Sequence, residues 1–110
     1  MAFDEQLADR VRARLDTTEA VTEKRMFGGL AFLVAGNLAV AVSGQGGLMV
    51  RVEPGETEAL LREPGAAPMV MRGKELDGWL RVDGDAVDGE EALAAWVDRG
   101  AAYARSLPPK

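Results

Sequence analysis

The chain has 110 residues, of which 47% are apolar and 28% are charged, and its formal net charge is −5. It contains neither histidine nor cysteine, which excludes disulfide bonds, zinc sites built from Cys or His, and catalysis by an imidazole or a thiol. This length suffices for a single hydrophobic core. We therefore expect residues 1–110 to form one domain, whose composition is more typical of a binding module than of an enzyme.

The sequence shows no feature of a secreted or membrane-spanning protein. Residues 1–5 include no basic residue, and no long apolar segment follows them. The longest apolar stretch, residues 30–42, is interrupted by Gly36-Asn37 and is shorter than the roughly 20 residues that span a bilayer. The sequence therefore predicts a cytoplasmic protein without a membrane partner.

The N-terminal segment has the pattern of an amphipathic helix. Every fourth residue from Phe3 to Leu15 is apolar, and charged residues lie between them. Asp4 is a suitable N-cap. We expect the helix to end near residue 16.

Two apolar runs, residues 28–35 and 37–43, predict a β-hairpin. The dipeptide Gly36-Asn37 suits a two-residue turn between them, because glycine tolerates a positive φ at the first central position. Residues 22–26 are a candidate for a further short strand before the hairpin. A strand with alternating character follows it at residues 48–52.

The expected turn sets a register for the hairpin. It places Val34 opposite Ala39 on one face and Leu33 opposite Val40 on the other, so both faces of the hairpin are apolar. Helices normally cover one face of such a sheet, and a second apolar face in so small a chain needs another cover. We expect a second subunit to provide this cover, which predicts a homodimer.

The second half of the chain begins with a short helix over residues 54–62 and continues with two strands. The strands are expected at residues 69–72 and 79–82, on either side of a turn at residues 73–78.

A long helix ends the chain. Asp88 and Glu91 have the spacing of a capping box at its start. The predicted order is α-β-β-β-α-β-β-α, an α+β fold with a largely antiparallel sheet. One apolar stripe along the last helix contains Leu93, Trp96, Val97, Gly100, Tyr103, Ala104 and Leu107.

The segment Val21 to Val34, with Arg-Met-Phe-Gly-Gly at residues 25–29, resembles the N-terminal domain of the TfoX/Sxy family. Residues 48–52 and 78–82 and the run from residue 96 to 110 agree with this resemblance in order. It implies a fold of the secretion-chaperone-like type. It also implies a relationship to bacterial regulators of competence for DNA uptake, which are thought to act with the cyclic-AMP receptor protein and carry a second, C-terminal domain. Residues 1–110 are then expected to be the N-terminal type standing alone, and the resemblance supplies no catalytic residue.

The same segment contains five candidate binding residues: Lys24, Arg25, Phe27, Gly28 and Gly29. Two cations beside two glycines with exposed backbone N–H groups can form a small anion-binding nest. The alternative is a glycine bulge that bends the strand and leaves the aromatic ring in the core.

Three further binding candidates lie on later strands. Arg51 and Arg81 form a basic patch with Arg25, Arg72 and Lys74 if all five share one face of the sheet, and the alternative is ordinary solvated charge paired with acidic neighbours. Trp79 can anchor a partner or ligand through its amphipathic ring, or it can simply fill core space. Aromatic residues make up only 5% of the chain, which disfavours a platform that stacks bases.

The acidic run over residues 83–91 does not fit a calcium-binding loop. Val87 occupies its fifth position, and glycine is missing from the sixth. We therefore expect no metal, no cofactor and no catalytic residue in this chain.

These features favour a small non-catalytic binding or regulatory module that acts through protein–protein contacts and is linked to transcriptional or competence regulation. The alternative is a nucleic-acid-associated regulator that uses a basic sheet patch of Lys24, Arg25 and Arg51, although a net acidic chain is a poor general binder of phosphate backbones. A small enzyme that works without His or Cys is the least favoured hypothesis. The sequence identifies no particular protein partner.

Overall fold

The computed structural model describes residues 3–15, 21–26 and 28–109. It confirms the predicted α+β class. Four strands, instead of the three in the predicted order, precede the middle helix, because the candidate strand near residues 22–26 is formed. The elements are α1 (Glu5–Leu15), β1 (Val21–Met26), β2 (Gly29–Val34), β3 (Asn37–Val42), β4 (Leu48–Arg51), the 3-10 helix η1 (Pro54–Glu56), α2 (Thr57–Leu60), β5 (Ala66–Met71), β6 (Lys74–Val82), the 3-10 helix η2 (Gly84–Val87) and α3 (Glu90–Ser106).

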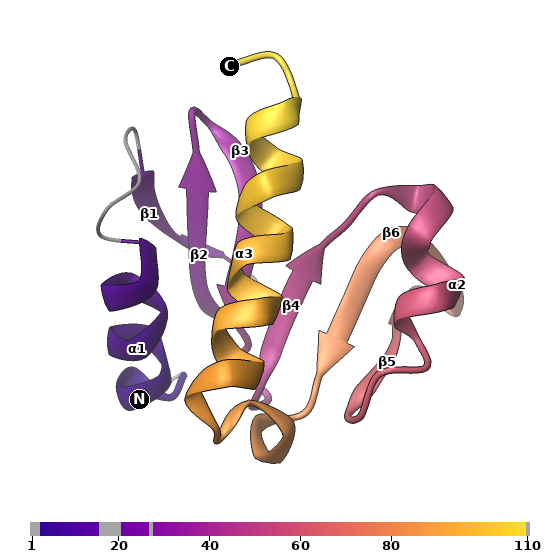
Figure 1. Ribbon diagram of the computed structural model, residues 1–110, viewed down its shortest axis with the longest axis horizontal. Coiled ribbons are helices and arrows are strands. Elements are labelled where there is room, and N and C mark those ends of the chain that lie inside the picture. Colours follow the sequence, from indigo (N-terminus) through magenta and orange to yellow (C-terminus); the bar gives the residue numbers. More distant parts are fainter. Residues whose placement is uncertain (1–2, 16–20, 27, 110) are drawn as a thin grey trace.

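The strands form one antiparallel sheet in the order β1-β2-β3-β4-β6-β5, with β1 and β5 at its edges (Figure 1). Helices α1 and α3 lie on one face of this sheet, where α3 packs along β3 and β4 (Figure 1). Leu60 of α2 also packs against the core on that face. Among the described residues no helix covers the opposite face, which we call the helix-free face. No helix in this part of the chain is long and apolar enough to span a membrane.

The main core lies between the sheet and these helices. Leu7, Val11 and Leu15 of α1 are at most 5% exposed, and burial of each such side chain contributes roughly 1.5–3 kcal/mol. The predicted stripe of α3 faces the same core, with two half-buried members, Tyr103 and Leu107. Its fully buried members are Leu93, Trp96, Val97, Gly100 and Ala104.

The two long helices begin differently from each other. Asp4 Oδ1 accepts hydrogen bonds from the backbone N–H groups of Gln6 and Leu7 at 3.0 and 3.2 Å, which confirms it as the cap of α1. The capping box predicted for α3 is wrong, because Gly89 is the N-cap and no side chain caps this helix. Asp88 instead has helical backbone angles and ends η2, so it cannot adopt the extended conformation of an N-cap.

The β2–β3 turn is one residue earlier than predicted. Ala35 and Gly36 both have positive φ, as a type I′ turn requires, and Val34 therefore lies opposite Asn37. A register shift at Phe32/Leu33 follows, so the predicted cross-strand pairs are wrong. Asn37 is buried as the first residue of β3, where its Nδ2 donates to the Pro108 carbonyl at 2.9 Å. This hydrogen bond to the segment after α3 accounts for Asn37 being part of β3 and not of the turn.

The β5–β6 turn is also tighter than predicted. Arg72 and Gly73 both have positive φ and form the turn alone, so the expected turn at residues 73–78 is mostly strand. Gly78 has φ +83° inside β6, its N–H donates to Thr57 Oγ1 at 2.9 Å, and its carbonyl accepts from Val52 N–H. These contacts with the η1–α2 region allow β6 to continue through a residue that local sequence rules place in a turn.

Candidate interaction surface

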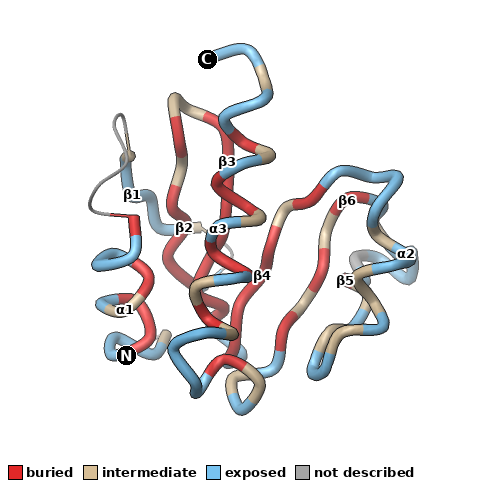
Figure 2. Tube along the Cα trace, viewed as in Figure 1, coloured by how far each residue is buried: buried red, intermediate tan, exposed pale blue. Residues whose placement is uncertain are grey.

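A second, smaller apolar cluster lies on the helix-free face. Its five buried residues come from four strands and are 0–8% exposed, although no described helix lies over them (Figure 2). They are Ala31, Leu38, Ala41, Met49 and Met69.

Four further side chains, which are less buried, pack against this cluster and form what we call the outer layer of the face: Met26 of β1, Leu33 of β2, and Leu76 and Trp79 of β6. All four are half-buried. The second apolar face predicted from the sequence is therefore real, but part of its cover comes from the sheet's own side chains. The surface that is accessible to solvent or to a partner is formed by the methionine, leucine and tryptophan side chains of the outer layer.

Arg51 borders this layer at the point where the sheet opens. The pairs between β3 and β4 end at Val40 and Val50, and the two strands then diverge (Figure 1). One residue later, Arg51 lies opposite Trp79, and its Cζ is 5.8 Å from that ring and 5.6 Å from the ring of Tyr103 on α3. Two cation–π contacts thus hold this guanidinium between a strand and a helix.

Arg81 lies on the helix-free face, opposite Met49. Its Nη1 donates to Gln45 Oε1 at 2.9 Å and its Nη2 to the Gly46 carbonyl at 3.3 Å. Both bonds fix the guanidinium against the β3–β4 turn.

Lys24 and Arg25 are separated by strand alternation. Arg25 lies opposite Leu30, a residue of the main core, and is therefore on the helix-covered side, whereas Lys24 lies opposite Ala31 on the helix-free face. β1 and β4 are three strands apart, which places Lys24 at least roughly 14 Å from Arg51. The structure thus brings Arg51 and Trp79 together and places Arg81 next to them on the same face, one same-face position further along β6. Lys24 and Arg25 lie apart from this group.

Residues 13–104 match the family model described as the TfoX N-terminal domain. The chain belongs to this family. Neither a curated protein nor a solved structure shows a significant match to it.

In this TfoX N-terminal domain the two glycines of the Arg-Met-Phe-Gly-Gly segment have different structural roles. Gly28 has φ +73°, which favours glycine. Gly29 is buried, and a Cβ there would lie 2.0 Å from the Val42 carbonyl oxygen of β3. The backbone of β3 therefore approaches β2 more closely than any other residue would allow. Phe27, the aromatic candidate of this segment, lies outside the described residues.

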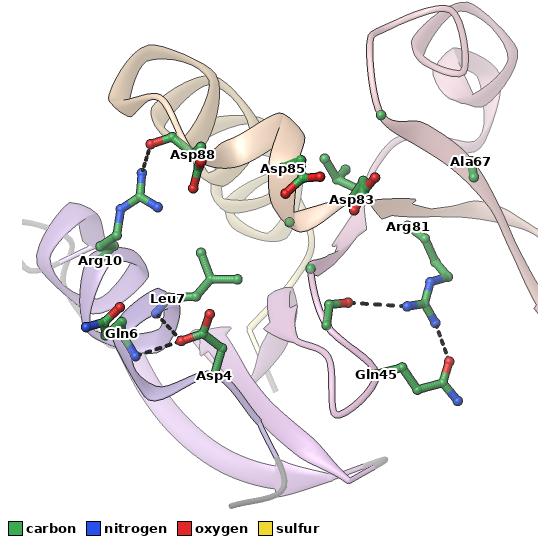
Figure 3. Close-up of a pocket in the computed structure, with 15 residues that line it drawn as sticks. Asp4, Gln6, Leu7, Arg10, Gln45, Ala67, Arg81, Asp83, Asp85 and Asp88 are labelled. Atoms are coloured by element: carbon green, nitrogen blue, oxygen red, sulfur yellow. Dashed lines mark hydrogen bonds between the residues drawn. The ribbon is translucent and has the colours of Figure 1, made fainter.

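A polar cavity of about 640 Å³ lies at one end of this TfoX N-terminal domain, between α1, the β3–β4 turn and η2 (Figure 3). Asp4, Asp83, Asp85 and Asp88 line it, and sequence reasoning missed the cavity because four separate segments of the chain form it. Arg10 Nη2 donates to the carbonyls of Val87 and Asp88 and is thus already engaged. Within the described residues no group of three acidic side chains is placed to hold a metal ion.

Two bidentate ion pairs connect α1 to its neighbours in this domain. Arg12 contacts Glu23 of β1 at 2.6 and 2.8 Å, and Arg14 contacts Asp98 of α3 at 2.5 and 3.0 Å. Hydrogen bonding to each arginine lowers the pKa of the Glu23 and Asp98 carboxyl groups below their ordinary values. Both carboxylates therefore stay ionised to a lower pH than ordinary carboxyl groups, and their ion pairs hold α1 against β1 and α3.

Proposed function

We propose that this chain is a cytoplasmic, non-catalytic binding module that forms a homodimer and contacts protein partners through its helix-free face. Membership of the TfoX N-terminal family supports a role in transcriptional or competence regulation. The observation that carries the proposal is the second apolar cluster, whose outer layer is half-buried and has no described helix over it.

The residue types of this outer layer favour a protein partner. Tryptophan, methionine and arginine are enriched in protein interfaces, and Trp79, Met26 and Arg51 all belong to this face or its border. The guanidinium of Arg51 already lies between two aromatic rings. Its side chain would therefore lose little conformational entropy when a partner binds.

The distribution of cations gives less support to a nucleic-acid partner. A phosphate backbone is bound by several neighbouring cations, whereas Lys24 and Arg25 point to opposite sides of the sheet and Arg51 is at least roughly 14 Å from Lys24. The net charge of −5 adds a general repulsion.

The test compares affinity purifications from the native host with three baits: the wild type, Leu33→Glu and Val70→Glu. Leu33 belongs to the outer layer, whereas Val70 is 58% exposed on β5 and is not part of the cluster, so the two variants add the same charge in different places. We expect proteins retained by the wild type and Val70→Glu to be lost with Leu33→Glu, provided that thermal unfolding shows both variants folded. Identical sets of retained proteins for all three baits would refute binding through the helix-free face.

A further inference from the structure

The two edges of the sheet differ in their ability to accept another strand. β5 contains Pro68, which has no backbone N–H, and its register against β6 shifts between Pro68 and Val70. Both features block pairing at a sheet edge. β1 contains no proline, and all six of its residues pair with β2 in unbroken register. β1 therefore offers an uninterrupted row of outward backbone N–H and C=O groups.

The middle of β1 is exposed on both sides of the strand, from Thr22 to Arg25 (Figure 2). In the described part of the chain Lys24 and Arg25 form no ion pair, whereas Glu23 pairs with Arg12 of α1. Charged residues at an edge usually prevent strand addition. Here the charges have both signs, so their effect depends on the strand that approaches.

In one antiparallel register the charges of β1 are complementary to themselves. When Lys24 lies opposite Lys24 of a second copy, Glu23 lies opposite Arg25 of that copy, and two-fold symmetry makes this pair occur twice. A shift of the second strand by two residues places Glu23 opposite Glu23 in one direction and Arg25 opposite Arg25 in the other. Registers between these would put residues from opposite faces of the sheet opposite each other. The charges thus select the register centred on Lys24.

We propose that β1 pairs in antiparallel fashion with β1 of a second copy of this chain, about a two-fold axis at Lys24. This inference rests on the homodimer of the proposed function. It places the second copy at the edge of the sheet, where that copy does not cover the helix-free face, so this face stays available to protein partners. Two six-stranded sheets become one sheet of twelve strands. Because an axis perpendicular to the sheet keeps like faces on the same side, the two helix-free faces join into one surface with Met26 near the joint. The contact between the two Lys24 side chains is the unfavourable feature of this register.

Because the chain has no cysteine, a single introduced thiol tests the register directly. In the Lys24→Cys variant the two thiols are on directly opposite residues, whose Cα atoms are about 4.5–5.5 Å apart in antiparallel strands, within the range of a disulfide. Thr22→Cys is the matched control, because it is exposed on the same strand but the two copies are separated by about 14 Å. We expect Lys24→Cys to form the covalent dimer at least about tenfold faster on mild oxidation. Equal rates for the two variants would overturn the proposed pairing.

Sedimentation of charge variants provides a second, independent measurement. Arg25→Glu places two acidic residues opposite each other twice, and we expect it to raise the dimer dissociation constant about 10- to 50-fold. Arg62→Glu changes the charge equally at an exposed position outside β1 and should leave the constant unchanged. Lys24→Thr removes the like-charge contact and should tighten the dimer.

The outcomes separate this inference from the proposed function. A wild-type dimer that is insensitive to Arg25→Glu and shows no preference for Lys24→Cys overturns pairing through β1 but leaves the homodimer intact. A wild type that remains monomeric at high micromolar concentration overturns both. Loss of partner binding on Leu33→Glu with normal dimerisation would show that the face and the edge act separately, as proposed.

Discussion

Gly100 is the residue on which the close packing of α3 against the sheet most directly depends. A methyl group at this position would lie 2.4 Å from the Ala39 carbonyl oxygen and 2.8 Å from Val40 Cγ1. The first of these contacts is with the backbone, which cannot rotate away as a side chain can. The absence of a side chain therefore sets how near α3 lies to β3.

We predict that Gly100→Ala lowers the free energy of unfolding by about 1–3 kcal/mol, because overpacking forces the helix away from the strand. The higher helix propensity of alanine opposes this by about 1 kcal/mol at most. Urea unfolding measures the difference. Gly55→Ala is the control, since a methyl group there meets nothing within 4 Å, and it should change stability by less than about 0.5 kcal/mol. Equal effects of the two substitutions would contradict the packing explanation.

The elements themselves were largely predictable, whereas their connections were not. The apolar periodicity of α1 and α3 is local information, and both helices occur where it predicts them. The turn before β3 depends on a contact between Asn37 and Pro108, which are far apart in the sequence, and the start of α3 depends on η2. Local turn and capping rules cannot include such contacts, so these boundaries were misplaced.

The same contrast applies to the candidate site. The opposite directions of Lys24 and Arg25, which divide the predicted basic patch, follow from the alternation of side chains along a strand and are therefore local information. The pairing of Arg51 with Trp79 requires β4 to lie beside β6, and the contact with Tyr103 requires the divergence of β3 and β4. Neither arrangement follows from any one segment of the sequence.

The hydrogen bonds from Asn37 of β3 to the end of α3 are expected to stabilise the fold. Asn37 is 1% exposed, and its Nδ2 donates to the carbonyls of Pro108 at 2.9 Å and Ala104 at 3.5 Å. Asn37→Ala leaves these carbonyls without that donor, and we expect a loss of about 1–2 kcal/mol in the free energy of unfolding. Ser106→Ala removes an exposed hydrogen bond at the same helix end and should cost much less. If urea unfolding gives equal losses of free energy for the two variants, the buried hydrogen bonds of Asn37 stabilise the fold no more than the exposed one of Ser106.

The two faces of the sheet differ in how they are covered. Helices α1 and α3 cover one face, whereas in the described part of the chain the helix-free face is covered only by side chains of the sheet. Three arginines of α1 each reach another element: Arg10 contacts Glu90 at the start of α3, Arg12 contacts β1, and Arg14 contacts Asp98 within α3. These pairs surround the main core on the helix-covered side. Among the described residues the helix-free face has no ion pair, which agrees with its proposed role as the surface that contacts protein partners.

The ion pairs of α1 make the stability of the whole fold depend on acid pH. The pKa values of Glu23 and Asp98 are lower in the folded chain than in the unfolded chain, so their contribution is fully present above the unfolded-state values of about 4. It is lost as the pH falls from there through the lower folded-state values. We expect a variant with Arg12→Gln and Arg14→Gln to unfold at a lower urea concentration than the wild type at pH 7, and the difference to shrink as the carboxylates become protonated. Arg62→Gln, at an exposed position without an ion pair among the described residues, should match the wild type at every pH. If the difference between the double variant and the wild type stays constant into strong acid, the two arginines stabilise the fold through packing of their alkyl chains and not through charge.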